Sequence, residues 1–310
     1  MESSDDDPRH ALRRRPLALA LATSLHWPCV ALLGALPLSS AFAQTCPISS
    51  NSITLFSGQC IVAPGTTLTQ TGNYETLVAA FNSGTVIDLT PGATLIGNGF
   101  QNIAVQMIDG GVVRLGASTP ITLTASNGNP AILIENTDAG TLGSNIPLSI
   151  TNANSTAFGL QATLGSQVTL GLDLQAVDAL TGVRADSGSS VTLVDASSIN
   201  MGQSPSWFSG AALMATGTDS VIDARSNTQI SMSGEGVVGA YMSDGGRVRV
   251  DASTGFSLSA PAGSYGSNGI VVDNTIAPTD TLGANLVLTL AGRTAPRWRR
   301  STVARSRSMA

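Results

Sequence analysis

The sequence predicts an all-β fold in which short parallel strands coil into a parallel β-helix, a solenoid of stacked rungs. The 310 residues are 42% hydrophobic but only 11% charged and 4% aromatic, and they include 33 glycines. Such a chain does not suit long soluble helices, whose outer faces need charge, and it is too apolar for disorder. Short segments alternate between apolar and polar residues, and one glycine-containing phrase recurs through most of the chain. Together these features favour short strands joined by tight turns.

The first 43 residues have the layout of a secretory signal peptide. A basic stretch that includes Arg13–Arg15 is followed by two apolar runs and by Ala41-Phe42-Ala43, a small-x-small cleavage pattern. The alternative is a membrane-spanning helix, which needs about 20 mostly apolar residues. His26 and two prolines interrupt the apolar stretch. We therefore expect export, with cleavage after Ala43 and Gln44 as the first mature residue.

Removal of this segment takes away both histidines, His10 and His26, and leaves two cysteines, Cys46 and Cys60. A Ser-His-Asp triad, a Cys-His dyad or a histidine-containing zinc site then has no imidazole. In an oxidising compartment the two cysteines predict one disulfide that closes a short loop, because a redox pair is more often spaced Cys-x-x-Cys.

One short phrase recurs between residues 109 and 250. Each copy has a small or acidic residue, a glycine, two small or polar residues and then alternating apolar positions. A glycine suits such a turn because a positive φ costs it little. The copy at Thr216–Ile222 carries one extra residue. The turn glycines of the five copies are Gly110, Gly165, Gly188, Gly217 and Gly245.

A second strand-like piece precedes most copies of the phrase, as at residues 159–162 and 239–242. A unit this small cannot bury its own apolar face, but stacked units can, with strands of successive turns paired in parallel about 4.8 Å apart. In this arrangement Val191, Val221 and Val248 lie over one another. An antiparallel sandwich is the alternative, but its strands have no reason to repeat at a nearly constant period.

The repeats resemble the rungs of pertactin-like autotransporter passenger domains of Gram-negative bacteria. A long signal peptide followed by a small N-terminal disulfide loop is similar to that family too. The resemblance covers about Gln44 to Gly292, and its motif is degenerate. It implies a right-handed parallel β-helix displayed at the cell surface, where adhesion to a host-cell or matrix surface is a common role. The segments that carry it most clearly are Gly182-Val183-Arg184-Ala185-Asp186-Ser187-Gly188-Ser189-Ser190-Val191-Thr192-Leu193 and Gly239–Asp251.

The segment Arg293–Ala310 departs from that family. It has six arginines, no acidic residue and no repeat phrase, whereas Gln44 to Gly292 has 16 acidic residues and five arginines. So abrupt a change is typical of a shifted reading frame. The alternatives are a solvated basic tail and a patch for nucleic acid or anionic lipid, and we expect no nucleic-acid partner. Nothing after Leu290 provides the alternating segments of the family's outer-membrane translocator barrel. We therefore expect a passenger fragment that reaches the periplasm, with the barrel in the intact gene product.

Three aspartates, Asp195, Asp223 and Asp251, follow successive phrases at intervals of 28 residues. In a coil with one unit per turn they are predicted to form a vertical column. Like charges about 5 Å apart repel, so each carboxylate must bond backbone amides at a turn, pair with arginine or share a hard cation. The turn role is the expected one, and no metal site is predicted. The candidate partners are Arg225, Arg247 and Arg249.

Two further segments could have a role beyond the repeat, one in catalysis and one in binding. Asp186-Ser187-Gly188-Ser189 resembles the nucleophile phrase of chymotrypsin-like proteases, but it is one copy of the repeat and has no histidine as base. Residues 197–209 are the longest irregular stretch within the repeats and carry Trp207 and Phe208. These aromatic residues predict either a contact loop or a segment folded over the rod.

The sequence therefore predicts a surface-display or adhesion rod that is not an enzyme and holds no cofactor. A long stack offers repeated polar loops along which binding to a large partner can spread. The alternative is a polysaccharide-active β-helix, a lyase or hydrolase that uses the aspartate column. Two catalytic carboxyls need pKa values pushed apart, and repeated aspartates in equivalent environments give no reason for such a difference.

Overall fold

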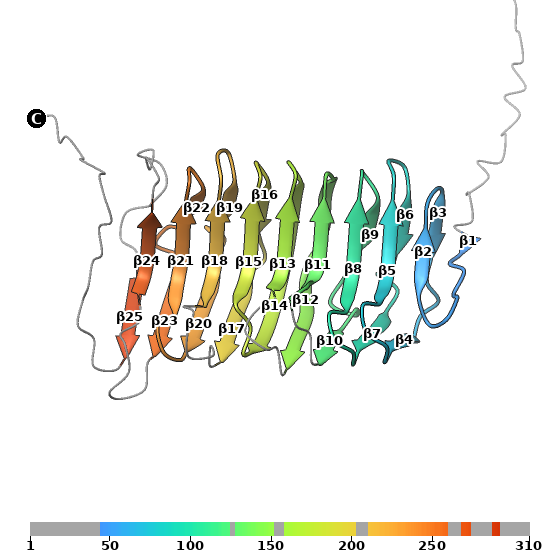
Figure 1. Ribbon diagram of the computed structural model, residues 1–310, viewed down its shortest axis with the longest axis horizontal. Coiled ribbons are helices and arrows are strands. Elements are labelled where there is room, and N and C mark those ends of the chain that lie inside the picture. Colours follow the sequence, from blue (N-terminus) through green and yellow to red (C-terminus); the bar gives the residue numbers. More distant parts are fainter. Residues whose placement is uncertain are drawn as a thin grey trace, which may run out of the picture. The chain divides into compact units, whose positions relative to one another are not determined.

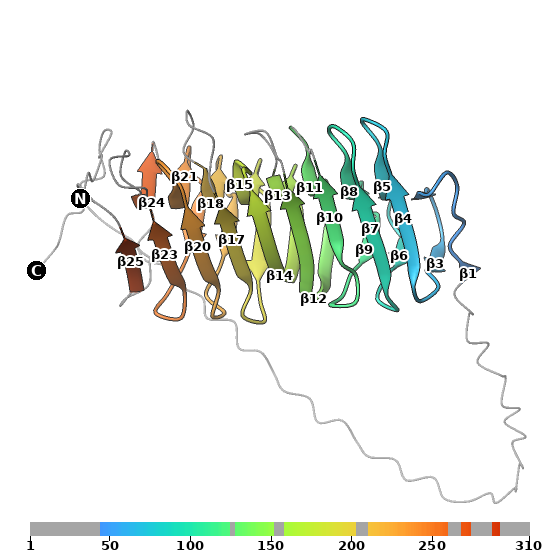
Figure 2. The ribbon, with the colours of Figure 1, turned by 90° about the horizontal axis from the view of Figure 1, so that it is seen from below.

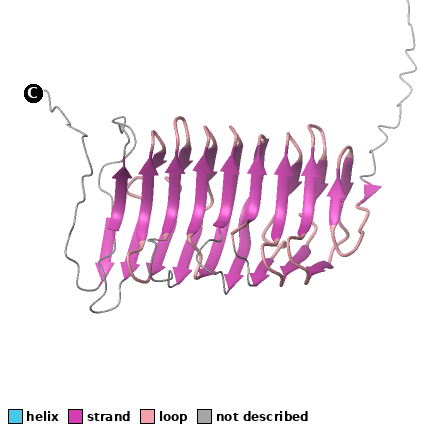
Figure 3. Cartoon of the chain, viewed as in Figure 1, coloured by secondary structure: helices cyan, strands magenta, loops and turns pink. Residues whose placement is uncertain are grey.

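The computed structural model describes residues 44–124, 128–151, 158–202, 210–259, 268–273 and 287–291, and the signal segment, Trp207, Phe208 and the basic tail lie outside these ranges. Every regular element within the described ranges is a β-strand, as the cartoon in Figure 3 shows. The strands form a parallel β-helix, which confirms the predicted fold class. Over the same ranges, no helix has the length and apolar character needed to cross a membrane.

Three parallel sheets make up the faces of the β-helix. The nine-stranded sheet contains β2 (Ile53–Leu55), β5 (Thr76–Phe81), β8 (Ile103–Ile108), β11 (Pro130–Glu135), β13 (Phe158–Thr163), β15 (Thr181–Asp186), β18 (Ala211–Thr216), β21 (Val238–Ser243) and β24 (Asn268–Asp273). The four-stranded sheet contains β1 (Gln44–Thr45), β3 (Gln59–Ile61), β6 (Val86–Asp88) and β9 (Val112–Arg114).

The twelve-stranded sheet has one long path and one branch. The path contains β4 (Thr66–Gln70), β7 (Ala93–Gly97), β10 (Ile121–Thr124), β12 (Asp138–Thr151), β14 (Gln167–Val177), β17 (Ser198–Gly202), β20 (Gln229–Ser233), β23 (Gly255–Ser259) and β25 (Val287–Ala291). The branch leaves β14 and contains β16 (Ser190–Leu193), β19 (Val221–Asp223) and β22 (Arg247–Arg249).

One turn of the coil takes β18 from the nine-stranded sheet, β19 from the branch of the twelve-stranded sheet and β20 from its long path. Figure 1 shows the nine-stranded sheet with its strands side by side in chain order, and Figure 2 shows the long path of the twelve-stranded sheet. Leu160 pairs with Val183, Val183 with Leu213 and Leu213 with Ala240, at intervals of 23, 30 and 27 positions. The stacking of units of about this length is therefore confirmed.

The inward side chains form an apolar axis in which Val191, Ile222 and Val248 are fully buried. Ile222 pairs with Val191 and with Val248. The prediction that Val221 occupies this column is therefore wrong. Thr218 and Asp219 separate Gly217 from the buried Ser220, whereas Gly188 is followed directly by the buried Ser189. The turn is thus longer by two residues, not one, and the alternation beyond it is displaced by one position.

The N-terminal region is tied to the first rung by the disulfide that the sequence predicts. Cys46 and Cys60 are joined, and both are buried. β1 runs parallel to β3 and pairs Gln44 with Cys60. The disulfide therefore fastens the start of the four-stranded sheet to the body of the β-helix.

Candidate functional site

The charged residues that the sequence singled out are most concentrated at the C-terminal ends of β19 and β22, in the branch of the twelve-stranded sheet. Asp223, the last residue of β19, pairs with Thr192 of β16 and with Arg249 of β22. A carboxylate therefore lies beside a guanidinium rather than beside a second carboxylate, and the predicted column of aspartates is wrong. The rungs differ in length: Thr192 and Asp223 are 31 positions apart, whereas Asp223 and Arg249 are 26 apart. A constant interval of 28 residues does not keep register through such rungs.

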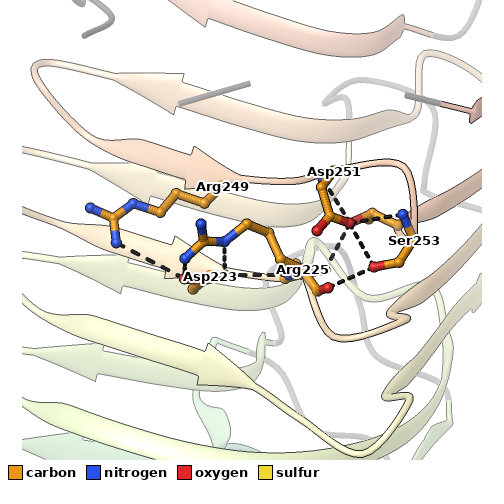
Figure 4. A network of polar contacts seen from close by, with 7 residues as sticks. Asp223, Arg225, Arg249, Asp251 and Ser253 are labelled. Carbon is orange, nitrogen blue, oxygen red and sulfur yellow. Dashed lines mark hydrogen bonds and ion pairs between the residues drawn. The ribbon is translucent and has the colours of Figure 1, made fainter. Parts of the chain in front are cut away.

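Arginine side chains hold the Asp223 carboxylate from two sides. Arg225 Nε donates to Asp223 Oδ1 at 2.8 Å, and Arg225 Nη2 lies 2.5 Å from Asp223 Oδ2. Arg249 Nη1 lies 3.9 Å from the same Oδ2 atom. The fork from Arg225 is bidentate, the strongest geometry for a pair of this kind. Figure 4 shows how these residues lie across adjacent strands.

Asp251 has a different set of partners, two residues beyond the end of β22. Its Oδ1 atom accepts a hydrogen bond from the Ser253 amide at 2.8 Å. Ser253 Oγ lies 2.6 Å from Asp251 Oδ1 and 2.6 Å from the Arg225 carbonyl, so its single proton can go to either oxygen. Asp251 thus has the turn role that the sequence predicts. Asp223 combines this role, through the Arg225 amide at 3.3 Å, with pairing to arginine.

The two carboxyl groups respond to these surroundings in the same direction. Burial raises the pKa of Asp223, but the hydrogen bonds and charges of Arg225 and Arg249 outweigh it and hold the pKa below the usual 3.8. Hydrogen bonds from the side chain and the amide of Ser253 hold the pKa of Asp251 below its usual value as well. Both groups are therefore anionic at neutral pH, and neither is prepared to act as a general acid.

The ion pair of Asp223 predicts a pH-dependent contribution to stability. A carboxyl group with a lowered pKa stabilises the folded chain above its unfolded pKa, and this contribution is lost as the pH falls through the folded pKa. We expect Asp223→Asn to cost about 1 kcal/mol at pH 7, and the difference from the parent chain to disappear below pH 3.8. Urea denaturation at several pH values measures this difference.

Asp219→Asn, in the exposed turn before β19, is the matched control and should change stability by less than about 0.5 kcal/mol across the same pH range. A difference for Asp223→Asn that grows on acidification would contradict the assignment.

A second polar cluster lies on the outer side of the nine-stranded sheet and surrounds Asp186. Arg184 Nε forms an ion pair with Asp186 Oδ2 at 2.8 Å, but its N–H is not aligned for a hydrogen bond. Gln161 Nε2 donates a hydrogen bond to the same oxygen at 3.0 Å. Thr163 Oγ1 donates to Asp186 Oδ1. The Arg184 guanidinium also lies over the Phe158 ring, 5.4 Å from its centre. Sequence reasoning missed this cluster because Gln161 and Thr163 come from the preceding rung.

The protease-like phrase forms one turn of the repeat. Ser187 and Gly188 have φ of 52° and 79°, and the hydroxyl of the fully buried Ser189 accepts a hydrogen bond from the Ser166 amide at 3.1 Å. The other repeat glycines, Gly110, Gly165, Gly217 and Gly245, have positive φ as well. Arg247 pairs with Val221 at the start of β22.

Two aromatic pairs near the N-terminal rungs were not singled out from the sequence. Phe56 is 61% exposed and stacks on Phe81 at 4.9 Å between ring centres, and Tyr74 is 70% exposed and meets Phe100 edge to face. The four residues are spread along the sequence, so no sequence pattern marks them. Their exposure and their pairing are seen only in the structure.

The described residues contain no group of three or more histidine, cysteine, aspartate or glutamate side chains placed to hold a metal ion. Comparisons of the chain with models of known families, with curated proteins and with solved structures find no match.

Proposed function

We propose that the chain is an exported rod of the pertactin-like autotransporter passenger type, which acts at the cell surface by adhesion rather than catalysis. The observation that carries the proposal is the unbroken parallel pairing of β2 through β24, which stacks one rung on the next about a single apolar axis. Such a stack presents a long surface on which weak contacts with a large partner add up. The partner class is a host-cell or matrix surface.

Two further features support export and a non-catalytic role. A buried disulfide is typical of proteins that fold in an oxidising compartment. The carboxyl groups of Asp223 and Asp251 both have lowered pKa values, whereas glycoside cleavage needs two carboxyls whose pKa values are pushed apart. In this proposal a translocator barrel within a longer gene product carries the rod across the outer membrane.

Expression in a Gram-negative host tests export and display. We expect the full chain to be cleaved after Ala43 and recovered from the periplasm with Cys46 and Cys60 joined. A version fused at its C-terminus to an outer-membrane translocator should be removed from intact cells by added protease. Deletion of residues 1–43 is the control and should leave both versions reduced and protected inside the cell.

An uncleaved, cytoplasmic full chain would contradict the export proposal. Release of reducing or unsaturated ends from anionic glycans by the purified chain would contradict the non-catalytic role.

A further inference from the structure

The outer side of the twelve-stranded sheet's long path has a regular chemical character. Between β10 and β23 most of its outward positions carry hydroxyl or amide side chains. Asp173 is the one charged residue within the described segments of these strands. The segments are 121–124, 146–151, 172–177, 198–202, 229–233 and 255–259. One column of paired residues runs through Thr122, Ser149, Gln175, Asn200, Ser231 and Ser257. We call this surface the hydroxyl–amide face.

The middle of the hydroxyl–amide face is hollowed into a groove. Its lining combines polar groups with the aliphatic side chain of Val177, which is 47% exposed, and with Gly202, which has no side chain to fill the space. The polar lining residues are Ser149, Thr151, Gln175 and Asn200. The groove is shallow and open to solvent, and it has a small apolar wall beside hydrogen-bonding groups.

Hydrogen bonds along the strands orient the amide groups of this groove. Gln175 Nε2 donates to Asp173 Oδ1 at 3.1 Å, and Asn200 Nδ2 donates to Gln175 Oε1 at 3.0 Å. Each amide nitrogen carries a second N–H, and each carbonyl oxygen has two lone pairs. The ladder therefore fixes both amides while each keeps hydrogen-bonding capacity for a ligand, which lowers the entropy lost on binding.

We propose that this groove binds a neutral, extended β-linked polysaccharide whose chain crosses successive rungs. A sugar ring has an apolar C–H face, which fits Val177, and a rim of hydroxyls, which fits the amides and the Ser149 and Thr151 hydroxyls. Two rungs span about 10 Å, a length suited to two sugar residues of an extended chain. Because Asp173 is the charged group of the face, an anionic glycan gains no charge complementarity there.

A periodic solid such as ice is a poorer fit to the same surface. Its flat lattice would need the same pair of side chains on successive rungs. The pair instead changes from Ser149 and Thr151 to Gln175 and Val177, and then to Asn200 and Gly202. The variation and the hollow suit a flexible polymer, which can adapt its hydroxyls to unequal partners.

Affinity electrophoresis of the full chain in gels containing hydroxyethylcellulose or β-mannan tests the proposal, with starch as the α-linked comparison and alginate as the anionic comparison. We expect retardation by at least one of the two β-linked glycans and none by starch or alginate. The double variant Gln175→Ala, Asn200→Ala should bind at least tenfold more weakly, and Val177→Asp should do the same by placing a carboxylate on the apolar wall. Gln106→Ala, at an outward position in the middle of β8, is the matched control and should bind within about twofold of the parent chain.

Thermal unfolding midpoints that match the parent chain show that the groove variants are folded. No retardation by either β-linked glycan, equal binding by the groove variants, stronger binding to starch or alginate, or shaping of ice crystals without glycan binding would each overturn the proposal. The inference rests on the rod proposed above as the displayed scaffold, but the two fail separately. A displayed chain that binds no glycan refutes only the groove, and a glycan-binding chain that stays in the cytoplasm refutes only display.

Discussion

Replacement of Ile222 by alanine is expected to destabilise the β-helix by about 2–5 kcal/mol, the usual cost of emptying a packed aliphatic site. The side chain is fully buried between Val191 and Val248, so the cavity opens within the shared axis and affects both neighbouring rungs. The midpoint and slope of a urea denaturation curve measure the effect. A solenoid can lose cooperativity between its rungs, so a changed slope would show that unfolding has become local.

Val221→Ala is the matched control, one residue away on the same strand. Val221 is only partly buried and pairs with Ser190 and Arg247, so we expect a cost below about 1 kcal/mol. The pair of variants determines the register of β19 directly. A larger cost for Val221→Ala than for Ile222→Ala would show that the strand is displaced by one position.

Loss of the Cys46–Cys60 disulfide is expected to cost about 3 kcal/mol, from the entropy of a loop closed over 14 positions. The effect should be concentrated at the N-terminal rungs, because each rung contacts only its neighbours. We expect the Cys46→Ser, Cys60→Ser double variant to become sensitive to limited proteolysis near β1 and β3 while the later rungs stay protected. Mass spectrometry of the fragments locates the first cleavages.

Ser49→Ala, in the loop that the disulfide closes, serves as control because it changes an exposed residue and leaves both cysteines in place. Its proteolysis pattern should follow that of the parent chain. Unchanged protection of β1 and β3 in the double variant would show that strand pairing alone holds this end of the β-helix.

The repeat phrase was enough to predict the class of fold because two physical constraints act on every copy. The alternation beyond Gly188 sets which side of the strand is apolar, and the small size of the unit forces it to stack. Neither constraint specifies how many residues form the turn between two strands. The displacement at Thr218 and Asp219 and the lost aspartate column both follow from turn length, which the apolar pattern does not encode.

The candidate sites were predictable only where their partners are close in the chain. The turn role of Asp251 depends on Ser253, two residues away, and was foreseen. The partners of Asp186 and the ladder from Gln175 to Asn200 come from adjacent rungs, 23 to 25 positions apart. Rungs vary in length, so these neighbours become known only with the strand register.

The variable rung length also has a consequence for how such a chain can change. From Val191 to Ile222 the coil takes 31 residues, yet the preceding rung, from Val168 to Val191, takes 23 and the buried columns stay aligned. Two of the surplus residues, Thr218 and Asp219, are exposed at a corner of the coil. A foreign peptide grafted between these two residues would therefore be carried outward, so the architecture can gain new epitopes by insertion while its interior sequence is left untouched.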